Sequence, residues 1–175
     1  MRIWKAGVCN ERGFTLIELA MVILVLGIMS AVTLPRVGGM LDRQRMRRTI
    51  NVVRGTVRYA QARAALTKRV YRLTFDLDKQ TLSACYVQAE ECRQEGGREL
   101  RQYVFPDSAR LLDVVNAAGE KTVEGEAITH FHPTGFAEPS TIHLAGPAEE
   151  RVTLIITPLG GSLKMLQGYV DPQSG

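Results

Sequence analysis

The side chain most suggestive of a specific chemical role is that of Glu18. Its carboxylate is the only charged group in an apolar run of 21 residues from Phe14 to Leu34. As a helix, with about 1.5 Å of rise per residue, the run would be about 32 Å long, close to the hydrocarbon thickness of a bilayer. An unpaired charge in a membrane costs at least about 2.5 kcal/mol. We therefore predict that residues 14–34 form a transmembrane helix in which Glu18 needs a positively charged partner.

The segment before this run is short and basic. Residues 1–13 contain Arg2, Lys5 and Arg12 against Glu11, a net charge of +2. By the positive-inside rule such a segment stays in the cytoplasm, which places the rest of the chain on the other side. An ordinary secretory signal would have an apolar core of about 7 to 15 residues and a small-x-small cleavage site, which this sequence reproduces poorly.

The order of these residues carries a specific resemblance. A basic leader that ends in Gly13, followed by Phe-Thr-Leu-Ile-Glu and the rest of the apolar run, closely resembles the prepilin signal of type IV pilins and type II secretion pseudopilins. The resemblance implies that a membrane aspartic peptidase cleaves between Gly13 and Phe14 and then N-methylates the new amino group of Phe14. Glycine suits the cleavage site because a backbone without Cβ lets the protease approach closely.

The same resemblance implies a role for Glu18. Its carboxylate would pair with the positive Phe14 amine of a neighbouring subunit already in the filament, and would so set the register of assembly. The rival interpretation is that Glu18 only snorkels to the headgroups near the start of the helix.

Basic charge is concentrated just after the apolar run. The net charge of +4 divides into +2 for residues 1–13, +7 for residues 14–68 and −5 for residues 69–175. The arginines of the middle segment run against the positive-inside rule, and we expect them to meet anionic headgroups, acidic heads of adjacent subunits, or solvent alone. The acidic C-terminal part argues against nucleic-acid binding, which needs a basic patch on the exposed head.

The elements that follow the membrane helix begin with its own extension, residues 35–68. Apolar side chains recur there in steps of four and three, which places them on one helix face that should pack on the head: Met46, Ile50, Val53, Val57, Ala60 and Ala64. Pro35, followed by Gly38 and Gly39, is expected to kink or locally melt the helix at the membrane exit.

Residues 69–175 have the two-residue periodicity of β-strands. Segments 70–75 and 81–87 flank an acidic turn and predict a hairpin. Further short segments bounded by Gly, Pro or acidic residues predict more strands: 99–105, 109–115, 127–132, 140–144, 152–157 and 161–166. We predict an α+β, pilin-like fold, in which the long N-terminal helix packs on a C-terminal antiparallel β-sandwich head.

A narrower resemblance lies within this head. Residues 128–136, Ile-Thr-His-Phe-His-Pro-Thr-Gly-Phe, precede two apolar strands and a closing glycine turn, and look like the C-terminal region of the H-type minor pseudopilins. Those proteins share a domain family with certain DNA-uptake minor pilins. Pro133 and Gly135 are expected to fix a turn and the phenylalanine to fill the core.

Cysteines and histidines are the remaining candidates for chemistry. For Cys85 and Cys92, in a compartment that permits disulfides, we predict a bridge that contributes about 2 to 3 kcal/mol and pins a strand end; two free thiols are the alternative. His130, His132 and His143 make a metal site conceivable if His143 opposes one of the other two on the next strand, but surface or hydrogen-bonded histidines are favoured and no metal is predicted.

The function follows from the resemblances and from what the sequence lacks. It has no nucleophile elbow, phosphate loop or zinc-protease motif, so neither catalysis nor a cofactor is predicted. The resemblances imply a minor pseudopilin of a type II secretion system, a single-pass inner-membrane protein whose head lies in the periplasm. Implied partners are the other major and minor pseudopilins, the prepilin peptidase and methyltransferase, and the inner-membrane assembly platform. The alternatives are a minor type IV pilin for pilus assembly or DNA uptake, and a periplasmic enzyme on a membrane anchor.

Overall fold

The protein is described by a computed structural model of the 175-residue chain, which covers residues 14–89, 91–93, 102–146, 150–160 and 162–171. Within residues 31–42 only the backbone is described. The predicted leader, residues 1–13, lies outside the described residues and Gly13 with it. The chain divides into two compact units, Met1–Gly39 and Met40–Gly175.

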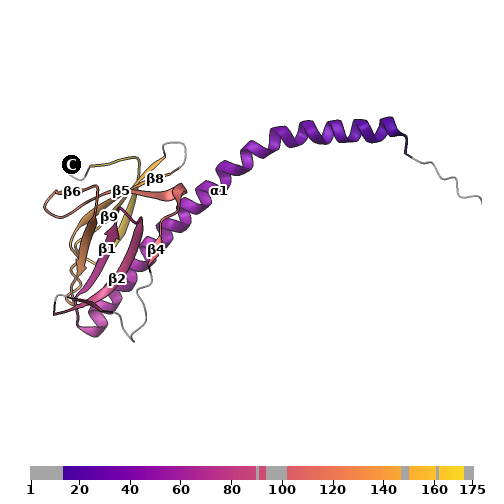
Figure 1. Ribbon diagram of the computed structural model, residues 1–175. Coiled ribbons are helices and arrows are strands. Elements are labelled where there is room, and N and C mark those ends of the chain that lie inside the picture. Colours follow the sequence, from indigo (N-terminus) through magenta and orange to yellow (C-terminus); the bar gives the residue numbers. More distant parts are fainter. Residues whose placement is uncertain (1–13, 90, 94–101, 147–149, 161, 172–175) are drawn as a thin grey trace, which may run out of the picture. The chain divides into compact units, whose positions relative to one another are not determined.

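One helix, α1, extends from Leu16 to Thr67 and contributes to both units (Figure 1). The backbone stays helical through Pro35, so the helix is not melted there; a kink at this proline stays a prediction. The predicted membrane segment, residues 14–34, extends into the part whose side chains are not described. In the portion of the chain that the structure covers, no helix is both long and apolar enough to cross a membrane.

The second half of α1 has the apolar face that the sequence predicts. The six side chains of this face, called here the buried stripe, each have an exposed fraction of 5 % or less: Met46, Ile50, Val53, Val57, Ala60 and Ala64. The helix ends at Thr67 because Lys68 takes a φ of 56°, the left-handed conformation that commonly terminates helices. The 3.6-residue periodicity thus identified correctly which face meets the head.

The head contains two antiparallel sheets, as predicted. The first has the order β3-β2-β1-β7, with β4 also paired to β2, and the second has the order β10-β9-β8-β5-β6. Strands of the first sheet are β1 (Tyr71–Asp76), β2 (Thr81–Gln88), β3 (Glu91–Arg93), β4 (Tyr103–Val104) and β7 (Glu126–Phe131). Strands of the second are β5 (Arg110–Val115), β6 (Lys121–Thr122), β8 (Ser140–Ala145), β9 (Arg151–Ile156) and β10 (Leu163–Gln167).

Most of these strands coincide with predicted segments. The hairpin of β1 and β2 is paired in register from Tyr71 opposite Tyr86 to Asp76 opposite Thr81. The segment predicted over 99–105 contains only the two-residue β4 within the described residues. Two very short strands, β3 and β6, and the 3₁₀ turn Asp107–Ala109 were not predicted, because they are too short to show a period.

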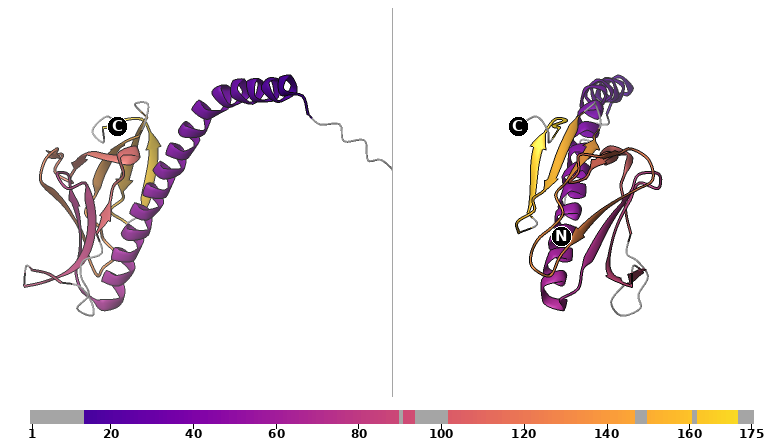
Figure 2. Two further views of the ribbon diagram at one scale, coloured as in Figure 1. Left: turned by 45° about the vertical axis from the view of Figure 1, so that its right-hand side comes forward. Right: turned by 90° about the vertical axis from the view of Figure 1, so that its left-hand side faces the viewer.

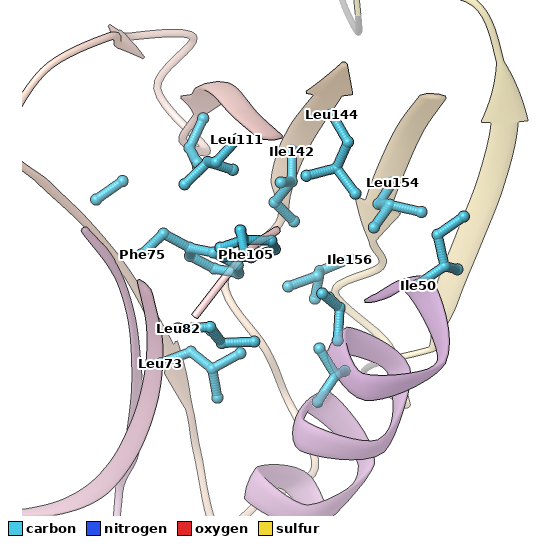
Figure 3. Packing of buried hydrophobic residues seen from close by; sticks show 14 of the residues in the cluster. Ile50, Leu73, Phe75, Leu82, Phe105, Leu111, Ile142, Leu144, Leu154 and Ile156 are labelled. Atoms are coloured by element: carbon cyan, nitrogen blue, oxygen red, sulfur yellow. The ribbon is translucent and has the colours of Figure 1, made fainter. Parts of the chain in front are cut away.

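A single apolar core joins the two sheets and α1. Its buried members come from both sheets and from the helix stripe. Figure 3 shows Phe75 and Phe105 in the middle of this core, with Ile50 entering from the helix. Within the unit Met40–Gly175, the two sheets splay apart and the second half of α1 lies against them, as Figure 2 shows.

The turn predicted at Pro133 and Gly135 is present. Gly135 has a φ of 85°, and its N–H donates to the carbonyl of His132 at 3.0 Å. Phe131, the last residue of β7, is buried with 1 % of its surface exposed, whereas Phe136 after the turn is 43 % exposed. The phenylalanine before the turn therefore fills the core, and the turn itself lies at the surface.

Candidate functional site

The candidate site is the start of α1, where Thr15 caps the helix. The Thr15 hydroxyl oxygen accepts a hydrogen bond from the backbone N–H of Glu18 at 3.3 Å. The Thr15 carbonyl accepts from the N–H groups of Glu18 and Leu19 at 3.1 and 3.2 Å. A threonine followed three residues later by glutamate is the spacing of a capping box, the sequence signal that would have identified Thr15 as a functional residue.

This cap places Glu18 in the first turn of the helix. Unpaired backbone N–H groups give that end of the helix a partial positive charge, which stabilises a nearby carboxylate by about 0.3 to 1 kcal/mol. The gain is smaller than the cost of at least about 2.5 kcal/mol for an unpaired charge in a membrane. Local capping therefore explains only part of why a carboxylate is placed here, and a further positive partner is still required in an apolar environment.

The surroundings of Glu18 on its own helix are apolar on all sides. Large hydrophobic side chains from Phe14 to Met29 are each at least 48 % exposed: Phe14, Leu16, Ile17, Leu19, Met21, Val22, Ile23, Leu24, Val25, Leu26, Ile28 and Met29. A helix that is apolar all round is stable when lipid or other protein covers it. The exposed apolar side chains of residues 14–30 are therefore typical of a helix that is covered by lipid or by protein.

The basic segment follows on the second half of the helix. Arg43, Arg47 and Arg58 are exposed and Arg54 is half-buried, while the buried stripe occupies another face. No Asp or Glu occurs between Arg43 and Lys68. The arginines of this part of α1 therefore have no acidic neighbour on the same stretch of helix.

The predicted disulfide links two strands of the first sheet. Cys85 on β2 and Cys92 on β3 are bonded, with their Cα atoms 5.5 Å apart. All three residues of β3 are exposed, so the strand has no core contacts of its own to hold it. The bridge and the pairing with β2 therefore hold this strand at the end of the sheet.

The three histidines are not brought together. His130 is on β7 of the first sheet, where Nδ1 lies 2.9 Å from an oxygen of Glu138. His143 is on β8 of the second sheet, so the suggestion that it opposes His130 or His132 on a neighbouring strand was wrong. His132 instead packs its ring near Phe136, with 5.8 Å between centroids. Across the described ranges, no three His, Cys, Asp or Glu side chains are grouped as metal ligands.

The comparisons with known proteins agree with both halves of this description. Residues 9–34 match the family described as the prokaryotic N-terminal methylation motif. That range contains Gly13, Phe14, Thr15 and Glu18. No curated protein sequence matches the chain significantly.

The head resembles solved structures of one protein. A structure of the minor pseudopilin EpsH from the type 2 secretion system of Vibrio cholerae matches with a TM-score of 0.53 and 14 % identity, over 70 % of this chain and 97 % of that one. A crystal structure of EpsH from the same organism gives 0.54 and 17 %, over 73 % and 98 %. The chain therefore joins an N-terminal methylation motif to a fold that it shares with EpsH.

Proposed function

We propose that this chain is a minor pseudopilin, a structural subunit of the periplasmic pseudopilus of a type II secretion system. The observation that carries the proposal is the combination of the methylation motif at residues 9–34 with a fold that matches 97 % of the solved EpsH chain over 70 % of this one. We assign it a structural rather than a catalytic role.

Processing would give α1 its working form. We infer that the prepilin peptidase cuts between Gly13 and Phe14 and that the new Phe14 amine is methylated. Because Thr15 already caps the helix, the processed chain would start one residue before an ordered first turn. The apolar side chains of residues 14–30 would then lie in the inner membrane before assembly and against other pseudopilins afterwards, with the head in the periplasm.

Glu18 would guide assembly in this proposal. The helix end supplies only a fraction of the stabilisation that a carboxylate needs in an apolar environment, so a methylated amine from an adjacent subunit would remove the remaining cost. Pairing at this one position would fix how far one subunit rises above the next. Partners of the chain are accordingly other major and minor pseudopilins and the inner-membrane assembly platform.

A minor type IV pilin is the competing function, because the methylation motif serves pilins as well. Its DNA-uptake form is disfavoured by the net charge of −5 over residues 69–175, which would repel phosphate. The exposed arginines of α1 are the counterargument, so a mobility-shift assay of the full-length chain in detergent at low salt is informative. Tight binding of DNA would favour the uptake function.

A deletion strain of the host bacterium tests the main proposal. Loss of protein secretion, restored by the wild-type gene and not by an uncleavable Gly13→Val variant, is the expected result. Normal secretion with loss of pili would support the minor pilin instead. An enzyme on a simple anchor would keep its activity in the uncleaved Gly13→Val protein, whereas a filament subunit would accumulate unprocessed and inactive.

A further inference from the structure

The outer face of the second sheet carries a row of buried polar side chains. Asp113 on β5 lies opposite His143 on β8, and His143 lies opposite Thr153 on β9. Strand residues alternate between faces, and the neighbours of His143, Ile142 and Leu144, belong to the apolar core. The row therefore points away from the core, yet its three members are between 0 and 4 % exposed.

The cover over this row is the C-terminal strap, residues 168–171, which follows β10. Gly168, with a φ of 87°, turns the chain, and its N–H donates to the carbonyl of Arg151 at 2.8 Å. The Thr153 hydroxyl donates to the Gly168 carbonyl at 2.7 Å and accepts from the N–H of Val170 at 3.0 Å. The ring of Tyr169 stacks on that of His143, with centroids 3.8 Å apart and 16° between the planes.

Both ring nitrogens of His143 face oxygen acceptors. Nδ1 lies 2.6 Å from Oδ1 of Asp113, and Nε2 lies 3.1 Å from the carbonyl oxygen of Val170. A neutral imidazole carries one N–H, whereas the imidazolium form carries two. Both contacts are hydrogen bonds only when the ring is doubly protonated. With a single proton, the charged carboxylate is the stronger acceptor and the Val170 carbonyl would face a lone pair.

Other charged and polar groups around His143 contact Asp113, so that deprotonation of the imidazole affects mainly its contact with the strap. Lys121 on β6 lies with Nζ 3.4 Å from Oδ2 of Asp113 and donates to the Tyr169 hydroxyl at 2.6 Å. That hydroxyl donates to Oδ2 of Asp113 at 3.2 Å. The Asp113 carboxylate therefore keeps a cation and a donor after His143 becomes neutral.

Two further charges lie near the strap itself. The Arg151 guanidinium on β9 is 5.9 Å from the centre of the Tyr169 ring, and the exposed Asp171 ends the described strap. The contact between Nε2 of His143 and the carbonyl oxygen of Val170 is the one that depends on the second imidazole proton.

We propose that His143, as an imidazolium, fastens the C-terminal strap to the outer face of the second sheet at Val170, and that loss of one imidazole proton loosens the strap there. Fastened, Tyr169 covers the row of Asp113, His143 and Thr153. When the strap opens, this row and the Tyr169 ring become accessible, and such opening is more frequent once His143 is neutral. The device is independent of the proposed secretion function.

Ring-¹⁵N-histidine spectra of the full-length chain in detergent test this directly. The sequence has three histidines, so His130→Gln and His132→Gln variants assign the signals. We expect two ring N–H groups on His143 at lower pH. On deprotonation, the protection factors of the Gly168 and Val170 amides should fall by about tenfold or more, while that of Ile142 in β8 is unchanged. A ring with one proton throughout the range in which these amides are protected would overturn the proposal, and so would titration of His143 without loss of protection.

A charge variant provides a second measurement. In Asp113→Asn the imidazolium loses its charged acceptor at Nδ1, so the amides of Gly168 and Val170 should be less protected than in the wild type already at the lower pH. The matched control is Glu138→Gln, which removes the carboxylate beside His130 and touches no part of the strap. Unchanged protection of these amides in Asp113→Asn, or an equal loss of protection in Glu138→Gln, would contradict the proposal. If Asp113→Asn does not fold, the wild-type spectra decide the question alone.

Discussion

Thr15 caps helix α1 by accepting a hydrogen bond from the backbone N–H of Glu18, and thereby holds the only carboxylate of the apolar segment in the first helical turn. The same short motif therefore does two things. It starts the helix with the Glu18 N–H bonded to the Thr15 hydroxyl, and it fixes where the Glu18 charge lies relative to the residue that processing would make the N-terminus.

The cap can be tested by removing one hydroxyl. We expect Thr15→Ala to destabilise the first turn by about 1 kcal/mol, because the Glu18 N–H loses its side-chain acceptor. Amide hydrogen exchange of Glu18 and Leu19 in the detergent-solubilised chain measures this, and both should exchange faster. Thr15→Ser keeps the hydroxyl and serves as the control. Equal exchange in Thr15→Ala and wild type would show that the cap contributes nothing.

The charge of Glu18 is tested separately from the cap. We expect Glu18→Gln to be inserted and cleaved normally but to be incorporated poorly, because the neutral amide cannot pair with the amine of a neighbouring subunit. In-cell crosslinking to the other pseudopilins measures incorporation, and gel mobility reports cleavage. Glu18→Asp retains the charge and should crosslink better than Glu18→Gln. If Glu18→Gln crosslinks to the other pseudopilins as well as the wild type does, Glu18 does not set the register of assembly.

Much of the fold is predictable because local periodicity reflects burial. The buried stripe from Met46 to Ala64 and the hairpin of β1 and β2 both follow from spacing alone. Other features depend on contacts between distant segments. Pairing of β1 with β7 joins residues that are 50 to 60 positions apart, from Asp76 with Glu126 to Tyr71 with Phe131, and β6 is only two residues long. Neither the β1–β7 pairing nor the short strand β6 produces a local sequence pattern from which it could be predicted.

The candidate site shows the same division. Gly13, Phe14 and Glu18 are marked by a contiguous motif, and the cap at Thr15 has a local spacing that could have been recognised. The environment of His143 is different, because it requires three strands and the strap to meet on one face. Sequence periodicity places His143 on a strand but does not show which sheet the strand joins, which is why its contact with Asp113 was not predicted.

Packing of α1 on the head is tested by truncating one stripe residue. Ile50 is 5 % exposed, and Ile50→Ala should lower the free energy of unfolding by about 2 to 5 kcal/mol, since it removes buried methyl groups and leaves a cavity. Leu66→Ala is the control on the same helix, because Leu66 is 75 % exposed and its truncation should change stability by less than about 0.5 kcal/mol. Chemical unfolding followed by circular dichroism measures both. Equal effects would mean that the helix does not pack as described.

The disulfide makes a separate prediction for stability. Removing the Cys85–Cys92 bridge with a Cys85→Ser, Cys92→Ser double variant should lower the free energy of unfolding by about 2 to 3 kcal/mol, the value expected for so short a loop. Reduction of the wild type should have a similar effect. Thermal unfolding with and without reductant provides the measurement, and the double variant should be insensitive to reductant. A wild type that is also insensitive would indicate that the thiols are not bridged in solution.

The turn between β1 and β2 predicts how stability depends on pH. Hydrogen bonds from the side-chain ammonium and the backbone N–H of Lys79 hold the pKa of Asp76 below its ordinary value of 3.8, and the same pair raises the pKa of Lys79 above 10.5. A lowered pKa in the folded state means that the charged carboxylate stabilises the fold above the ordinary value, and that this contribution is lost as pH falls through the folded value. We expect the stability of the wild type to fall more steeply below about pH 4 than that of Asp76→Asn, which lacks the titrating group.

Urea unfolding from pH 2.5 to 7 compares the two proteins, with Glu124→Gln, an exposed carboxylate outside this pair, as the control. At neutral pH Asp76→Asn should already be the less stable protein, because the amide cannot form the ion pair with Lys79. The difference between wild type and Asp76→Asn should shrink toward low pH, whereas Glu124→Gln should follow the wild type throughout. A constant difference across the whole range would mean that the turn is held by shape and backbone hydrogen bonds, and that the charge of Asp76 makes no contribution.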